Sequence, residues 1–235
     1  LPYLQLIGSL LYLTMTRPDI CYHMSILCSF MHDPSPACYY AAIDLLLYIV
    51  HTSDTHITFT GSTSVPRGVD ASCHAGVAAG GGLLAYSDSS WRNPNRLGFN
   101  SFGYVIYLFG APVSYASKRL KVIAHSSAEA EYAAASYACR EIVFVRNVLA
   151  DLGFQVSGPT VLAVDNQAAI KIAENHGVTS RTKHFGDAMH YLRHLVDHRV
   201  VRLTFVRTDA QHADGFTKIL GQGPFRLWSK LLYRE

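Results

Sequence analysis

The sequence is poor in charged residues and in paired cysteines, and it contains no long hydrophobic run. Asp, Glu, Lys and Arg make up 16% of the 235 residues, and the formal net charge of +3 permits a polyanionic partner without requiring one. The five cysteines form no CxxC pair, which excludes a disulfide framework or a cysteine zinc site as the organising feature. An intracellular, reducing compartment is therefore expected.

The stretch from Leu4 to Met15 is apolar but too short to span a bilayer, and it lacks the basic region and cleavage site of a signal peptide. We therefore expect no membrane partner. The chain begins at Leu1 inside a predicted element, so we expect it to be a piece of a longer polypeptide. Its 49% hydrophobic content is enough for a folded core.

The first 60 residues have the spacing of apolar residues that is typical of helices. Helices are predicted over 4–15, 20–31 and 37–50, with Pro18 in the first turn of the second. Gly, Ser, Ala and Thr dominate the segment 61–82, which predicts a linker.

From residue 83 the pattern changes to three strands followed by alternating helices and strands. This order predicts an α/β fold with a mixed sheet flanked by helices. The hairpin is expected to turn at Gly110-Ala111, and a final helix is expected from Ala213 onward. The predicted strands are 83–89, 99–109, 112–117, 160–164 and 200–206, of which the second and third form the hairpin. The other helices of this part are predicted at 126–152, 166–175 and 182–198.

Two acidic residues lie where a carboxylate is costly without a cation. Asp88 belongs to the otherwise buried strand LAYSDS, and Asp165 ends the strand VLAV directly before a helix. The edge of an α/β sheet at the ends of its strands is where ligands usually bind. Both positions therefore favour a cation site.

Three further acids lie near the starts of predicted helices, where structural and functional explanations compete. Glu129 has the three-residue spacing from Ser126 of a capping box, which is a sufficient structural role, whereas Glu131 lies among alanines that allow it to reach the sheet. Asp214 has a structural alternative as an N-terminal acid favoured by the helix dipole. Taken together, Asp88, Glu131, Asp165 and Asp214 offer oxygen ligands that suit two Mg²⁺ or Mn²⁺ ions and phosphoryl displacement.

The residues resemble the end of the reverse transcriptase and the ribonuclease H domain of copia-type LTR retrotransposon Pol polyproteins. The resemblance covers nearly the whole chain, in the order of that family. It is carried by LIGSLLYL at 6–13, TRPDI at 16–20, YSD at 86–88, SSAEAEY at 126–132, VDNQAA at 164–169, RTKH at 181–184, and Ala213-Asp214 with Thr217-Lys218.

The resemblance implies a ribonuclease H-like fold, with a five-stranded mixed sheet flanked by helices and preceded by a small helical segment. The implied units are a helical tail of reverse transcriptase at 1–60, a linker at 61–82, the nuclease domain at 83–222 and a C-terminal tail at 223–235. The implied activity is metal-dependent hydrolysis of the RNA strand of RNA–DNA hybrids. The implied partners are the hybrid and the rest of the polyprotein, in the cytoplasm (virus-like particle) with a nuclear presence also possible.

In that family the four acids hold two metal ions. Carried over by residue, Asp88 would bridge both ions, Glu131 and Asp165 would complete one site, and Asp214 would bind the other. Candidate substrate contacts follow from proximity to these acids and from a basic cluster at a helix entrance. They are Ser90, Asn166, Gln167, Arg181, Lys183 and His184.

Two alternatives accompany this interpretation. His190, His194 and His198 share the four-residue spacing of a helical face, which could hold zinc, but no HExxH motif accompanies them and a polar helix face explains them. Departures from the family pattern, such as Ile43-Asp44-Leu45-Leu46 in place of a basic stretch, leave open a weak or inactive remnant that serves as a hybrid-binding or structural module.

Overall fold

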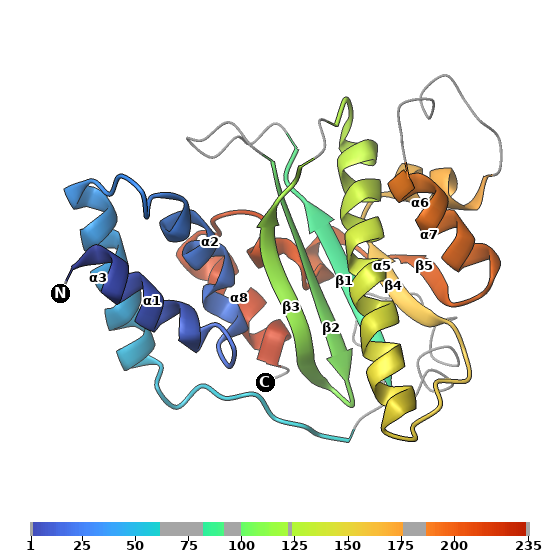
Figure 1. The fold of residues 1–235 in the computed structure, drawn as a ribbon, viewed down its shortest axis with the longest axis horizontal. Helices are drawn as coiled ribbons and strands as arrows, with labels where there is room; N and C mark the ends of the chain where they lie inside the picture. The colour runs from blue at the N-terminus through green and yellow to red at the C-terminus, as the bar shows by residue number, and fades with distance from the viewer. Residues whose placement is uncertain (1, 62–81, 92–99, 122–123, 176–186, 234–235) are drawn as a thin grey trace.

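The computed structural model describes residues 2–61, 82–91, 100–121, 124–175 and 187–233 (Figure 1). Its centre is a five-stranded sheet in the order β3-β2-β1-β4-β5. The strands β1, β2 and β3 pair antiparallel, whereas β1–β4 and β4–β5 pair parallel. The strand bounds are Leu83–Ser89 (β1), Ser101–Leu108 (β2), Ala111–Arg119 (β3), Thr160–Val164 (β4) and Val201–Phe205 (β5).

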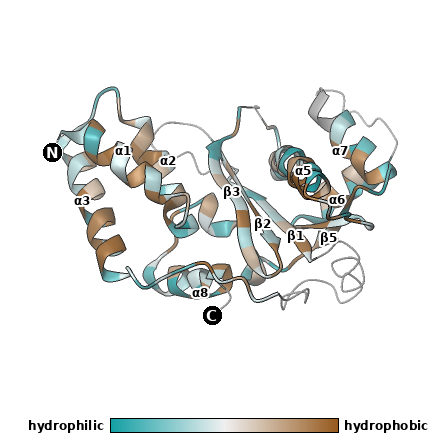
Figure 2. Cartoon of the chain, turned by 60° about the horizontal axis from the view of Figure 1, so that its bottom comes forward, coloured by the Kyte–Doolittle hydropathy of each residue, from teal (hydrophilic) through white to brown (hydrophobic). Residues whose placement is uncertain are grey.

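This strand order and these directions are those of the ribonuclease H-like fold, which confirms the predicted fold class. On one face of the sheet lies the long helix α5 with α6 and α7, and on the other lie a short turn, η4, and helix α8 (Figure 2). Their bounds are Ser127–Asp151 (α5), Gln167–Glu174 (α6), Asp187–Asp197 (α7), Asp214–Phe216 (η4) and Gln222–Tyr233 (α8).

Alternation along β1 explains how two cores form on one sheet. Leu83 and Ala85 are buried in the core beneath α5, while Leu84 and Tyr86 are buried in the core beneath α8. Successive side chains of a strand point to opposite faces. The next residues of the strand continue the alternation, so Asp88 belongs to the α8 face and Ser89 to the α5 face.

The hairpin between β2 and β3 turns one residue earlier than the sequence predicted. Phe109 and Gly110 form the turn, with φ values of 49° and 90°, and Ala111 already belongs to β3. Two successive positive φ values are typical of a two-residue turn whose twist matches the strands. Gly110 indicated a turn in the sequence, but nothing there indicated that Phe109 would be the other turn residue.

The predicted continuous final helix from Ala213 is wrong. A single 3₁₀ turn covers Asp214–Phe216, and the helix α8 begins only at Gln222. Gly215 lies directly against the ring of Trp228, and a Cβ atom at that position would clash with it. Packing of α8 back onto the turn therefore replaces a continuous helix. As a result, the expected tail at 223–235 is helical as far as Tyr233 and buries Trp228, Leu232 and Tyr233.

Residues 3–51 form a helical unit with its own core, beside the β3 edge of the sheet (Figure 1). Its helices are α1 (Tyr3–Leu13), the short η1 (Pro18–Ile20), α2 (Cys21–Ser29) and α3 (Pro36–His51). Among the described residues, no helix is both long and apolar enough to span a membrane. The boundaries of the four expected units stay predictions, and residues 62–81 of the expected linker lie outside the described residues.

A buried ionic network joins this helical unit to α8. Arg17 donates to both carboxylate oxygens of Asp19, at 3.0 and 2.8 Å. Both residues are buried, with exposed fractions of 5% for Arg17 and 1% for Asp19. The hydroxyl groups of Tyr48 and Tyr233 each donate to Asp19 at 2.6 Å. Because Tyr233 is the last residue of α8, its hydrogen bond to Asp19 links α8 to the helical unit.

Candidate metal centre

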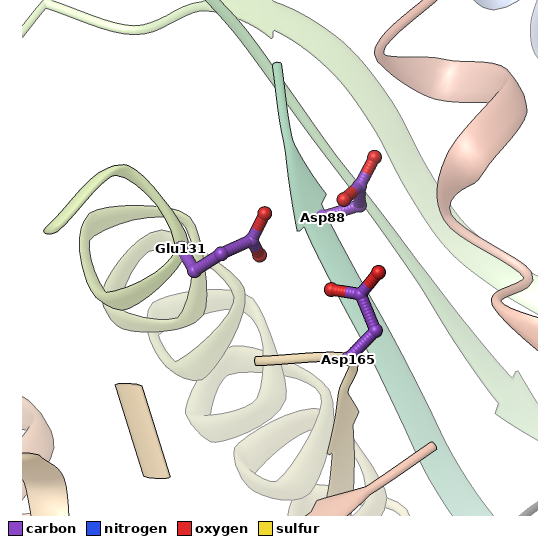
Figure 3. A group of neighbouring side chains, drawn as sticks. All are labelled: Asp88, Glu131 and Asp165. Atoms are coloured by element: carbon purple, nitrogen blue, oxygen red, sulfur yellow. The ribbon is translucent and has the colours of Figure 1, made fainter. Parts of the chain in front are cut away.

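The side chains of Asp88, Glu131 and Asp165 converge at the end of β1 (Figure 3). Each offers a carboxylate oxygen, and these atoms all lie within 4.8 Å of one another. Asp88 lies on β1, Asp165 follows β4, and Glu131 comes from the first turns of α5. Three segments far apart in the sequence therefore build one acidic cluster.

Strand register brings the two aspartates together. Tyr86 of β1 pairs in parallel with Ala163 of β4, and two further residues along each strand lead to Asp88 and Asp165. Because parallel strands advance together, carboxylates at matching positions are neighbours. The structure thus places the two predicted acids side by side, while their role as metal ligands stays a prediction.

Glu131 reaches the sheet from the opposite side because α5 packs closely there. The buried Ala130, Ala133 and Ala134 keep the helix close to the strands. One oxygen of Glu131, Oε1, accepts hydrogen bonds from the backbone N–H and from the hydroxyl of Ser89, each at 3.1 Å. Among the described residues its other oxygen, Oε2, is buried without a hydrogen-bond partner.

Glu129 has the structural role that the sequence predicted for it. Its N–H donates to the Ser126 hydroxyl at 3.2 Å, and its carboxylate accepts from the N–H of His125 at 2.6 Å. These bonds satisfy donors at the start of α5. The helix therefore uses one acid as a cap and directs Glu131 to the sheet.

Asp214 lies next to the cluster but is outside the three-residue group. It begins the turn η4, and its Oδ2 forms an ion pair with Lys218 Nζ at 2.8 Å. Burial is the main cause of the raised pKa of Asp88 and of Asp165, and the negative charge of Asp214 raises both further, so Asp214 belongs to the same electrostatic site. Its Oδ1 is buried without a hydrogen-bond partner among the described residues.

Side chains that the sequence analysis assigned no role hold the carboxylates in place. Thr217 donates to Asp88, and Thr208 donates to Asp165 Oδ2 at 3.3 Å. Gln211 donates to the carbonyl of Ser87 at 3.0 Å and accepts from Ala213 N–H at 3.1 Å, which ties the segment before Asp214 to β1. The Thr217-Lys218 pair was part of the family motif, but nothing in the sequence indicated its partners.

Burial and mutual repulsion disfavour negative charge at this cluster. Burial, together with the charge of Asp214, raises the pKa of Asp88 to about 7. The pKa of Glu131 is raised well above its ordinary value by burial and by the charges of Asp88 and Asp165, and burial also raises that of Asp165. A bound cation would reverse this penalty.

These shifts predict an unusual dependence of stability on pH in the metal-free protein. Asp88 binds its proton more tightly in the folded chain than in the unfolded chain, where its pKa is about 3.9. Stability should therefore fall as the pH rises from about 4 to 7, by on the order of 3 kcal/mol. Thermal unfolding in EDTA at pH 5 and pH 8 measures this, and Mg²⁺ should restore stability at pH 8. An equally stable metal-free protein at both values would contradict the account.

The residues predicted to contact the substrate differ in burial and in their hydrogen bonds. Ser90 is buried, and its hydroxyl accepts from Ser101 N–H at 2.8 Å. Asn166 caps α6 by accepting from Ala168 N–H and Ala169 N–H at 3.0 and 3.2 Å, whereas Gln167, the first residue of α6, is exposed. Their contacts with RNA stay predictions. Arg181, Lys183 and His184 lie outside the described residues.

The zinc alternative finds no support in the described part of the chain. His194 and His198 are exposed, with ring centroids 4.0 Å apart, and His198 Nδ1 bonds the carbonyl of His194 at 2.8 Å. The group of metal-ligand atoms found among the described residues is the Asp88, Glu131 and Asp165 cluster.

A ribonuclease H-like sheet with carboxylates gathered at the ends of the neighbouring strands β1 and β4, joined by Glu131 of α5, defines a ribonuclease H-like domain with a candidate metal centre. Two Pol polyproteins of Arabidopsis thaliana transposons are similar to the chain. The retrovirus-related Pol polyprotein from transposon RE2 is 33% identical over 97% of this chain, and that from transposon RE1 is 33% identical over 95%. These polyproteins are homologues of the chain, which agrees with the resemblance of its sequence to the Pol polyproteins of copia-type retrotransposons.

The chain spans about 15% of the length of these relatives. No protein-family model matches it. Among solved structures, LC11-RNase H1 in complex with an RNA/DNA hybrid is similar, with 17% sequence identity, a TM-score of 0.42, and coverage of 57% of this chain and 93% of that one.

Proposed function

We propose that this chain is the ribonuclease H region of a retrotransposon Pol polyprotein and hydrolyses the RNA strand of RNA–DNA hybrids. The observation that carries the proposal is the convergence of Asp88, Glu131 and Asp165 within 4.8 Å. Asp88 and Glu131 are only 4% and 5% exposed. Three carboxylates so close together are costly unless a cation joins them.

The donor set fits divalent cations of the Mg²⁺ or Mn²⁺ type. All the candidate ligand atoms are carboxylate oxygens, which these ions prefer. The buried Oε2 of Glu131 and Oδ1 of Asp214 lack hydrogen-bond partners among the described residues, so each has capacity for a further ligand. Asp88, Glu131 and Asp165 would hold the metal, with Asp214 completing a two-ion site. Such ions supply activation of water and stabilisation of the leaving oxygen.

The surrounding side chains fix the direction of each carboxylate. Ser89 orients Glu131, Thr217 orients Asp88, and Thr208 orients Asp165. Outer partners of this kind are usually important for metal affinity. Lys218 pairs with Asp214, and its pKa is raised by that bond and by the charges of Asp88 and Asp165, which together outweigh burial. Its positive charge offsets part of the repulsion in the metal-free protein.

Choice of the RNA strand requires contacts to ribose 2′-hydroxyl groups beside the cluster. Gln167, two residues after Asp165, is exposed and has amide donors and an acceptor suited to a hydroxyl group. We propose Gln167 as the first such contact, and the remainder of the polyprotein as the partner that delivers the hybrid.

Cleavage of a labelled RNA strand annealed to DNA tests the proposal. The purified chain should cut the RNA internally in Mg²⁺ or Mn²⁺, leaving a 3′-hydroxyl and a 5′-phosphate. EDTA should stop the reaction, and the same RNA paired with RNA should remain intact. Hybrid binding without metal-dependent cleavage would instead favour the inactive-remnant alternative.

A further inference from the structure

A second charged feature lies on the other side of α5 from α6 and α7. It is a groove of about 540 Å³ between the end of β3 and α5. Lys118, Arg119 and Lys121 line one wall and Arg140 the other, while Glu141 is the carboxylate among its lining residues. The groove therefore has an excess of positive charge that the carboxylate cluster does not explain.

Sheet register places one end of this groove close to the cluster. Lys118 of β3 pairs with Phe102 of β2, and Phe102 pairs with Ser89, the neighbour of Asp88. Two strand spacings correspond to about 10 Å. The positive wall is therefore at the same end of the sheet as the carboxylates.

Helix α5 gives a second estimate of the distance between the groove and the carboxylate cluster. Arg140 follows Glu131 by nine residues on α5, which corresponds to about 14 Å along the helix axis. Each strand of a nucleic acid carries one phosphate per about 3.4 Å of duplex axis. The groove thus begins about three or four nucleotides from the cluster.

Aromatic rings hold Arg140 in position. Its guanidinium lies over the ring of Tyr137, 5.3 Å from the centroid, and 5.9 Å from that of Tyr191. Tyr137 itself stacks on the buried Phe102, with centroids 4.5 Å apart and an angle of 18°. With Phe102 stacked on Tyr137 and Arg140 also over its ring, the arrangement favours contact with phosphates over base stacking.

We infer that this groove binds the phosphodiester backbone of a nucleic-acid strand extending beyond the carboxylate cluster. The inference rests on the proposed function for the identity of the ligand. Lys118 and Arg140 would each contact a phosphate from opposite walls. Such contacts fix the position of the strand, carry no sequence preference and weaken with salt.

A paired substitution with a matched control tests the inference by binding alone. Lys118→Gln combined with Arg140→Gln removes two charges from the groove. Arg226→Gln combined with Lys230→Gln removes the same two kinds of charge from exposed positions on α8, on the opposite face of the sheet. Fluorescence anisotropy in EDTA would follow binding to a blunt hybrid, a hybrid with an RNA overhang and one with a DNA overhang, between about 50 and 200 mM salt.

The groove pair should bind an overhang probe about tenfold more weakly at low salt, with a salt slope reduced by about one and a half to two. The control pair should resemble the wild type, and the overhang with the larger loss identifies the strand. Equal binding by both pairs, with unchanged melting curves, would overturn the inference even if the wild type cleaves RNA. Loss of binding in the groove pair alone would support it even if the wild type does not cleave.

Discussion

Asp88→Asn should reduce metal-dependent cleavage of the RNA strand by about 10³-fold or more, which corresponds to at least about 4 kcal/mol of transition-state stabilisation. Asparagine has nearly the same shape as aspartate but no negative charge, and it replaces one carboxylate oxygen with an amide nitrogen. Asp88 is central because it is flanked by Glu131 and Asp165 and is the acceptor for Thr217. Single-turnover cleavage of a labelled hybrid measures the effect.

The matched control is Asp209→Asn. Asp209 is an exposed aspartate that pairs with Arg207 at 2.9 Å, and its side chain is 67% exposed. Cleavage should be unchanged in this variant. In addition, Asp88→Asn should make the metal-free protein no less stable than the wild type, because it removes a buried charge that repels its neighbours. Cleavage by Asp88→Asn within tenfold of the wild type would refute the assignment of the site.

Asp19→Ala should destabilise the protein by about 3–5 kcal/mol, because it leaves the buried Arg17 guanidinium without its partner. The hydroxyl groups of Tyr48 and Tyr233 lose their acceptor at the same time. Arg17 and Asp19 belong to the helical unit and Tyr233 to α8, so the damage should extend across that contact. Urea unfolding followed by circular dichroism gives the free energy of unfolding.

Two substitutions calibrate this result. Tyr233→Phe removes one hydrogen bond to the carboxylate and should cost about 1–3 kcal/mol. Asp33→Ala removes an exposed acid between α2 and α3 and should change the free energy by less than about 0.5 kcal/mol. A cost for Asp19→Ala no larger than that for Asp33→Ala would show that the network does not hold the two parts together.

Sequence patterns were sufficient for the elements whose signals are local. The bounds of β1 and β4 match the predictions, because each is a run of buried residues that ends at a polar segment. The start of α5 was predicted from its cap, which forms between Ser126 and Glu129. Local chemistry determines these features, so neighbouring residues report them.

Features that depend on distant contacts were not predicted. The interruption between η4 and α8 depends on Trp228 packing over Gly215. Likewise, the bond from Thr217 to Asp88 joins residues that are 129 positions apart. The three converging acids could be found because each is unusual in its own segment, whereas an ordinary threonine gives no such signal.

Manganese binding tests the central claim most directly. Crystals of the wild type and of Asp88→Asn would be soaked in Mn²⁺ and measured for anomalous scattering. We expect a manganese peak among the Asp88, Glu131 and Asp165 carboxylates in the wild type, and a much weaker or absent peak in the variant. A wild-type cluster that stays free of manganese at saturating concentration, with its carboxylates accessible in the crystal, would contradict the account.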